Sequence, residues 1–221
     1  MAQAEGDGAA ANRAYALGME AGVPAAFGLA AHSAYAPLAG AADYELAESL
    51  AQKGRAFDDW LSAEVLTVLY SRELIEGKGP EDALEVALEQ AEAGNPVGQF
   101  FAGYFFLSGV GTDPDATTAE RWLTAAVEQG YLHANSFLAE LYETGKDTVE
   151  PRPDRAAELL WAALSKGDPT ALDRLTNQIA ERSPDVVREV QARLRDAGAF
   201  AGRIEGLAGP ETVSAVQSFV Y

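Results

Sequence analysis

Residues 94–130 read GNPVGQFFAGYFFLSGVGTDPDATTAERWLTAAVEQG, and this stretch decides the fold. Alanine, leucine and glutamate, which are strong helix formers, dominate the chain, and apolar residues recur here at helical spacing. The spacing is carried by Ala119, Leu123, Ala126 and Val127. Glycines at 109–111 predict a turn between two helices, and we expect Trp122 to lie on the core face of the second helix.

Three landmarks return along the chain with a period of 36 or 37 residues. A glycine ends each repeat, an alanine stands eleven residues before it, and a small residue follows four residues after it. In that order they are Gly94, Gly130 and Gly167, then Ala83, Ala119 and Ala156, then Gly98, Ala134 and Ala171. The glycines suit left-handed helix ends, and the small residues allow close approach of helix backbones. This period predicts a stack of helix pairs that bury their apolar faces against their neighbours.

The rest of the chain also predicts an all-α fold, because strand patterns are nearly absent. Residues 131–167 form a second good repeat whose loop is lengthened across 146–155. Upstream, the repeat over 55–94 needs a shift to align its first helix, and the repeat over 22–54 is more degenerate still. Its recognisable landmarks are Ala47, Ala51 and Gly54.

The repeat pattern resembles the Sel1-like repeat family, which is related to tetratricopeptide repeats. In the best repeat it is carried by Gly94-Asn95, Gly98-Gln99, Ala102-Gly103, Phe106, Gly109-Val110-Gly111, Asp113, Ala119-Glu120-Arg121-Trp122-Leu123 and Ala125-Ala126. The resemblance implies a right-handed α-solenoid of helix-turn-helix repeats over 21–182, with 94–130 and 131–167 as its best repeats. In such proteins the concave face usually binds another protein. We expect residues 1–20 to be a flexible segment or a first helix.

Residues 184–221 carry a second pattern, which follows the helix-start signal Ser183-Pro184. Its landmarks are Val187, Val190-Gln191, Leu194, Gly198, Phe200, Gly202, Ile204-Glu205-Gly206, Gly209, Thr212, Ala215-Val216 and Phe219. The pattern resembles the small three-helix peptidoglycan-binding domain, with Glu205 in place of the usual loop aspartate. Because the sequence stops at Tyr221, we expect a truncated module. The resemblance implies a glycan-binding loop formed by Gly202, Ile204, Glu205, Gly206 and Gly209.

Charge and composition disfavour several partner classes. The 221 residues include 34 acidic and 16 basic side chains, a net charge of −18, so nucleic acid is not an expected partner. Residues 1–149 carry −16 and residues 150–221 carry −2. The absence of cysteine excludes disulfides, thiolate metal sites and cysteine nucleophiles. No apolar run reaches the roughly 18–20 residues of a membrane-spanning helix, so we expect no membrane insertion.

The first residues, MAQAEGDG, lack the basic start and apolar stretch of a signal peptide. Ala2-Gln3-Ala4 nevertheless has the small-x-small form of a signal-peptidase site. Peptidoglycan lies outside the inner membrane, so the resemblance of the tail favours a periplasmic protein whose signal peptide has been removed.

Candidate metal ligands are few. His32 and His133 are the two histidines, and neither has a second histidine at helical spacing, which predicts surface or packing roles. Asp113, Asp115 and Glu120 suggest calcium only superficially, because the loop lacks the glycine and terminal glutamate spacing of an EF-hand. We therefore expect no metal and no cofactor.

Candidate catalytic groups are equally sparse. Asp58-Asp59 and Glu81-Asp82 are interpreted as acids that complement helix N-termini. Glycoside cleavage needs two carboxylates at a defined separation, and 34 acidic residues offer many accidental pairs. A Gly-x-Ser-x-Gly nucleophile elbow and a phosphate-binding glycine loop are both absent. The sequence thus predicts a protein that is not an enzyme, with a hydrolase that uses an unrecognised acidic pair as an alternative.

Five aromatic residues gather at 100–106, and they cannot all face one core. Phe101 and Phe105 share one helix face, and Phe100 and Tyr104 share another. We expect Phe100 and Tyr104, together with Tyr131 in the next repeat, to anchor a protein partner, because aromatic side chains dominate binding hot spots. Packing between repeats is the alternative role.

The function predicted from these observations is a non-enzymatic periplasmic scaffold whose acidic concave face binds a basic protein partner. A peptidoglycan- or polysaccharide-binding accessory of wall remodelling or polysaccharide export is a second hypothesis. A regulator of a membrane sensor kinase is a third.

Overall fold

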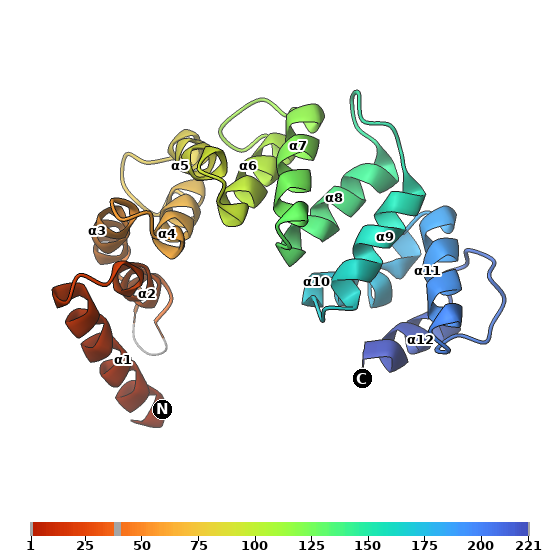
Figure 1. Cartoon of the computed structure of the whole chain (residues 1–221), viewed down its shortest axis with the longest axis horizontal. Helices are drawn as coiled ribbons and strands as arrows, with labels where there is room; N and C mark the ends of the chain where they lie inside the picture. Colours follow the sequence, from red (N-terminus) through yellow and green to blue (C-terminus); the bar gives the residue numbers. More distant parts are fainter. Residues whose placement is uncertain (1, 38–40, 221) are drawn as a thin grey trace. The chain divides into compact units, whose positions relative to one another are not determined.

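The computed structural model describes residues 2–37 and 41–220, and this part of the chain is helical without a named strand. Figure 1 shows the order of the helices along the chain. They are α1 (Ala2–Glu20), α2 (Pro24–Tyr35), α3 (Tyr44–Arg55), α4 (Trp60–Ser71), α5 (Pro80–Glu92), α6 (Pro96–Ser108), α7 (Ala116–Glu128), α8 (Leu132–Thr144), α9 (Pro153–Leu164), α10 (Pro169–Thr176), α11 (Pro184–Asp196) and α12 (Pro210–Val220), with a 3-10 turn at Ile179–Glu181. The predicted all-α repeat solenoid is confirmed, and α1 shows that residues 2–20 form a first helix.

The backbone repeats more regularly than the sequence does. Left-handed residues with φ between 55° and 85° stand at Gly22, Asp58, Gly94, Gly130 and Gly167, which are 36, 36, 36 and 37 residues apart. In each case the next helix begins two residues later, from α2 through α4, α6 and α8 to α10. The upstream repeats therefore align without the expected shift.

Side-chain caps explain where several of these helices begin. Asp59 accepts a hydrogen bond from the backbone N–H of Ser62 at 3.0 Å, and Asn95 accepts one from Val97 at 2.9 Å. Asp115 caps α7 by accepting from Thr117 and Thr118. Such caps satisfy amide groups that have no partner within the helix. The N-terminal role expected for the Asp58-Asp59 pair is thus filled by its second member.

A small residue allows α5 and α6 to approach closely. A Cβ atom built on Gly98 would lie 2.4 Å from Cβ of Gln90 and 2.7 Å from the backbone nitrogen of Ala91. No side chain fits there without movement of the helices, because the obstructing atoms include backbone. This contact explains why position 98, four residues after Gly94, is glycine.

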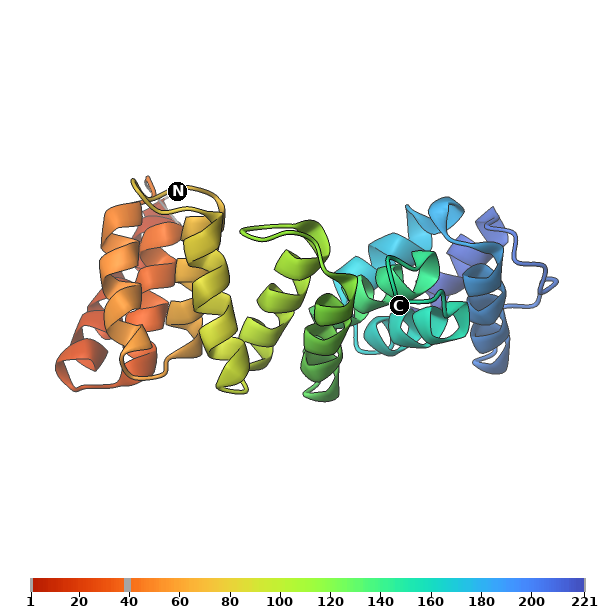
Figure 2. The same ribbon diagram turned by 90° about the horizontal axis from the view of Figure 1, so that it is seen from above.

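The chain divides into two compact bodies, Met1–Pro114 and Asp115–Tyr221. In the first body each helix packs against the next along the chain, and α2 also packs against α4. Figure 2 shows α2 to α5 standing side by side. In the second body α8 packs against α9, and the tail joins this packing because α11 contacts α9 and α12 contacts α10. Trp161 of α9 lies with its ring centroid 4.4 Å from that of Phe219 in α12.

One expectation about the core is wrong. The buried face of α7 consists of Ala116, Ala119, Leu123 and Ala126, whereas Trp122 is only half-buried. Adjacent helix positions point about 100° apart, so the face that buries Leu123 turns Trp122 towards its edge. The guanidinium carbon of Arg121 lies 4.6 Å from the Trp122 ring centre.

Candidate partner-binding surfaces

An apolar row follows one face of α6. It consists of Val97, Phe100, Tyr104 and Leu107, which we call the α6 stripe. Their spacing of three, four and three residues places them on one side of a helix, and each is half-buried. The helix is fixed at both ends by the Asn95 cap and by Gly109, which adopts a left-handed φ of 77°.

The rings of the α6 stripe form a stacked pair. Phe100 and Tyr104 lie with ring centroids 6.4 Å apart and planes inclined by 15°. Phe105, on the adjacent face, is 1 % exposed and belongs to the core, while Phe101 lines a narrow space beside α4 and α5. The predicted separation of the aromatic cluster into two faces is therefore present. The pair at Phe100 and Tyr104 offers a partner a partly exposed aromatic surface.

Tyr131 lies in the second body, where it precedes α8. It is half-buried, and its ring centroid is 5.7 Å from that of the exposed His133. Nδ1 of His133 is 3.4 Å from Oδ2 of Asp168, the residue that caps α10. The structure thus brings Phe100 and Tyr104 together on one helix of the first body, and Tyr131 is part of the second body.

The candidate metal ligands do not come together. His32 is exposed on α2, with its ring centroid 6.3 Å from that of Tyr35. Among the residues described, no group of three or more histidine or acidic side chains is placed to hold an ion. Glu120, one of the superficial calcium candidates, accepts a hydrogen bond from the Tyr142 hydroxyl at 2.9 Å and pairs with Arg152.

This acid–tyrosine contact recurs in the first body. The Tyr70 hydroxyl donates to Oε1 of Glu48 at 2.7 Å, and both contacts join residues 22 positions apart. Burial raises the pKa of Tyr70 and of Tyr142, and the hydrogen bonds to the glutamates act in the same direction. Two of the acids that make the chain so negative therefore have a structural role.

The remaining charge is unequal between the two bodies. The first body contains 17 acidic and 5 basic residues, a net charge of −12, and the second contains 17 acidic and 11 basic residues, a net charge of −6. The stronger field surrounds the body that carries the α6 stripe. A positively charged partner would be attracted to that body during diffusional encounter.

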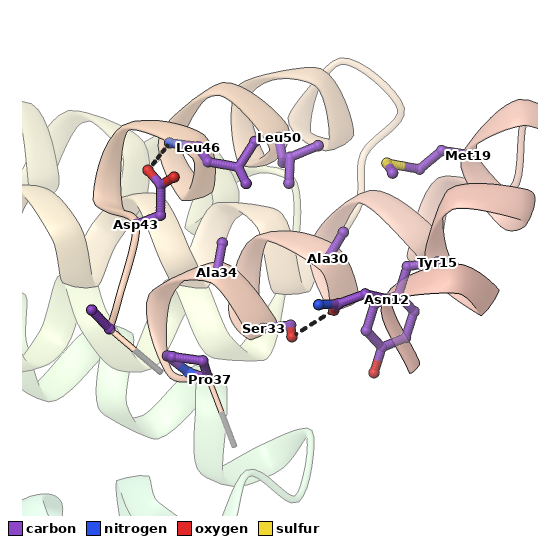
Figure 3. A pocket seen from close by; sticks show the side chains of 11 residues that line it. Asn12, Tyr15, Met19, Ala30, Ser33, Ala34, Pro37, Asp43, Leu46 and Leu50 are labelled. Carbon is purple, nitrogen blue, oxygen red and sulfur yellow. Dashed lines mark hydrogen bonds between the residues drawn. The ribbon is translucent and has the colours of Figure 1, made fainter. Parts of the chain in front are cut away.

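A pocket of about 410 Å³ lies between α1, α2 and α3, and sequence reasoning missed it. Figure 3 shows Tyr15 and Met19 of α1 on one side and Leu46 and Leu50 of α3 on the other. The α2 residues Ala30, Ser33 and Ala34 line the space between them. The pocket depends on how α1 packs against α2, which no local sequence pattern specifies.

Three of the polar side chains that line this pocket already have partners. The Ser33 hydroxyl donates to Oδ1 of Asn12 at 3.0 Å, and Asp43 accepts from the backbone N–H of Leu46 at 2.9 Å (Figure 3). Leu46 is 48 % exposed at the pocket. The arrangement suits an apolar side chain better than a polar metabolite, because few uncommitted polar groups converge on it.

In the tail, the loop expected to bind glycan is held by Gln191 of α11. Oε1 of Gln191 accepts from the backbone N–H groups of Glu205 and Gly206, at 3.1 and 3.0 Å. Nε2 donates to the carbonyl of Leu207 at 3.0 Å and to Oγ1 of Thr212 at 2.9 Å. Gln191 is 2 % exposed, so this amide is an internal brace for the loop. A polar residue on the otherwise apolar buried face of α11 is the sequence feature that indicates this role.

The loop residues have different surroundings. Glu205 and Gly209 line a space of about 350 Å³, Gly202 lines a neighbouring one, and Ile204 is half-buried. Gly206 has a φ of 73°, and a Cβ atom there would lie 2.3 Å from the carbonyl oxygen of Pro184. Glycine is therefore required at position 206 by the backbone itself.

Comparison with known proteins reveals a likeness in fold. No family model and no curated protein matches the sequence. A Sel1 repeat protein from Oxalobacter formigenes superposes with a TM-score of 0.67 at 15 % identity, over 95 % of this chain and 77 % of that one. The protective antigen c5321 of uropathogenic Escherichia coli, which displays an SLR fold, gives a TM-score of 0.65 at 17 % identity. That match covers 95 % of this chain and 55 % of the antigen. The chain thus has the fold of the Sel1-repeat solenoids.

No helix among the described residues has the length and apolar character needed to cross a membrane.

Proposed function

We propose that this protein is a non-enzymatic scaffold that binds a protein partner through the concave face expected of its repeats, with the α6 stripe as the main contact. The observation that carries the proposal is the stacked, half-buried pair Phe100 and Tyr104 in a Sel1-like repeat fold. Aromatic side chains add large contact area at little cost in conformational entropy, so such a pair suits a binding hot spot.

The partner is expected to be basic. The body that contains the α6 stripe carries −12, and long-range attraction accelerates the association of oppositely charged proteins. Tyr131 is proposed as a separate contact on the second body. The apolar pocket beside Leu46 offers room for one partner side chain in addition.

A periplasmic location and a tail that docks on the cell wall remain part of this proposal. The tail over 184–221 is proposed to be a peptidoglycan-binding-like module. The space beside the loop that Gln191 braces supports the second candidate function, a peptidoglycan- or polysaccharide-binding accessory. Regulation of a membrane sensor kinase is one form that the scaffold role could take.

Affinity capture from an envelope fraction tests the scaffold role. The wild-type protein, Tyr104→Ala and the matched control Tyr44→Ala, which changes a half-buried tyrosine on α3, serve as baits. The proposal expects a protein that wild type and the control retain and that Tyr104→Ala loses while folded. Equal retention by all three would contradict it.

A pulldown on purified peptidoglycan tests the second candidate. Glu205→Ala removes a side chain that lines the loop space and leaves the backbone N–H that Gln191 accepts from. Wall binding that this variant weakens would support a glycan-binding tail. Failure of wild type to sediment with the wall would contradict it.

A further inference from the structure

The turn between α3 and α4 departs from the repeat in a way that the fold does not require. It reads Phe57-Asp58-Asp59-Trp60. The equivalent turns read Ala21-Gly22-Val23-Pro24, Ala93-Gly94-Asn95-Pro96, Gln129-Gly130-Tyr131-Leu132 and Lys166-Gly167-Asp168-Pro169. This turn alone among the five has an aromatic residue at its first and last positions and a carboxylate in place of the left-handed glycine.

Both aromatic side chains are exposed. Phe57 is 55 % exposed and Trp60 is 50 % exposed, although burial of such large apolar side chains would be favourable. One side of Phe57 stacks on Phe27 of α2, with ring centroids 5.7 Å apart and planes inclined by 18°. The Trp60 indole makes no ring contact or hydrogen bond with the residues described. Trp60 is the first residue of α4. After three of the other four turns the first helical residue is proline, which suits that position.

The carboxylate of Asp58, which is exposed, is also available. Asp59 caps α4, but the Asp58 side chain makes no hydrogen bond or ion pair within the described parts of the chain. Asp58 has a φ of 55°, a conformation that costs free energy in any residue with a Cβ and that glycine provides in the other four turns. The turn thus carries an uncommitted negative charge that stands between two exposed aromatic residues in the sequence.

We propose that Phe57, Asp58 and Trp60, the turn cluster, bind an arginine-bearing segment of a partner protein. A guanidinium group stacks on an indole face and pairs with a carboxylate in a planar geometry, which an ammonium group does less well. The net charge of −12 on this body favours a cationic segment over an acidic one. The inference rests on the proposed scaffold function only in taking the partner to be a protein, and it adds a contact surface distinct from the α6 stripe.

The repeat itself supplies a test variant that preserves the fold. The variant combines Phe57→Ala, Asp58→Gly and Trp60→Pro. Its turn then has the same residues as the equivalent turn before α6, except that the helix cap Asp59 is kept. A matched control changes an exposed leucine and an exposed acid on α1, as Leu17→Ala with Glu20→Gln. Circular dichroism and thermal melting establish that each variant is folded before binding is measured.

The probe is a fluorescein-labelled peptide that alternates glycine, leucine and arginine, compared with versions that carry lysine, citrulline or glutamate instead of arginine. Anisotropy titrations use the full chain at low salt. We expect affinity in the order arginine, lysine, citrulline, glutamate, and a loss of about tenfold or more for the triple turn variant. The α1 control should bind as wild type does, and Tyr104→Ala, which changes the proposed α6 contact, is measured beside it.

A second readout locates the contact. The chain has three tryptophans, so its nitrogen–proton spectrum contains three indole signals, and Trp60→Pro identifies one by its disappearance. That signal should shift with the arginine peptide. The proposal is overturned if no peptide binds at about 1 mM, if the glutamate peptide binds equally, or if the turn variant retains full affinity. It is also overturned if the turn cluster instead mediates self-association or vesicle binding. Loss of peptide binding in Tyr104→Ala alone would overturn the turn cluster and leave the α6 stripe standing.

Discussion

Replacement of Gln191 by leucine removes the brace of the tail loop. The substitution keeps the approximate size of the side chain but deletes four hydrogen bonds, two accepted from backbone N–H groups and two donated by the amide. Each bond contributes about 1 kcal/mol net, and a buried group left without a partner costs more. Water can reach the exposed Glu205 and Leu207 and replace part of this loss, whereas Gly206 is buried. We expect the free energy of unfolding of the second body to fall by about 2–4 kcal/mol.

Hydrogen exchange is the direct assay, because two of the lost bonds are accepted from the N–H groups of Glu205 and Gly206. Their exchange should accelerate by about 30-fold or more if the loop opens locally. Gln217→Leu, at an exposed position on α12, is the matched control and should change stability by less than about 0.5 kcal/mol. Unchanged protection at 205 and 206 in Gln191→Leu would refute the assignment of Gln191 as the brace.

Three further predictions concern stability and are measured by urea or thermal unfolding. Leu123→Ala should lower the free energy of unfolding by about 2–5 kcal/mol because Leu123 is fully buried, and Trp122→Ala should lower it less. A larger loss for Trp122→Ala would mean that Trp122 lies in the core. Gly98→Ala should cost about 1–3 kcal/mol, because a Cβ atom meets the α5 backbone, and a neutral result would mean that α5 and α6 are further apart. Hydrogen bonds from the Thr118 side chain and backbone lower the pKa of Asp115. The ionised carboxylate therefore stabilises the folded state above the unfolded pKa of about 4, and this stabilisation is lost as pH falls through the lower folded pKa. Asp115→Asn should therefore reduce the loss of stability on acidification, and an unchanged pH profile would contradict this.

The fold was largely predictable because glycines that follow helix ends recur with the period of the repeat. Gly94, Gly130 and Gly167 are required by left-handed backbone and therefore persist as a sequence pattern. The upstream register was obscured at one point, where Asp58 adopts the same conformation without being glycine. At this position the repeat is kept in the backbone conformation although the glycine is missing from the sequence.

The sites were less predictable because they depend on tertiary packing. Helical spacing correctly separated Phe100 and Tyr104 from Phe105, since neighbouring positions on a helix face different directions. The same spacing could not tell whether Trp122 or Leu123 faces the core, because both are apolar. The pocket between α1 and α3 depends on the packing of α1 against α2, and no motif within any one helix encodes it.

The scaffold function is tested most directly by the kinetics of partner binding. With the captured partner immobilised, association and dissociation rates are measured for wild type and Tyr104→Ala at about 50 and 500 mM salt. We predict that salt slows association, because it screens the acidic first body, and that Tyr104→Ala accelerates dissociation, because an anchor is lost. Binding by folded protein that is indifferent both to salt and to Tyr104→Ala would contradict the proposed function.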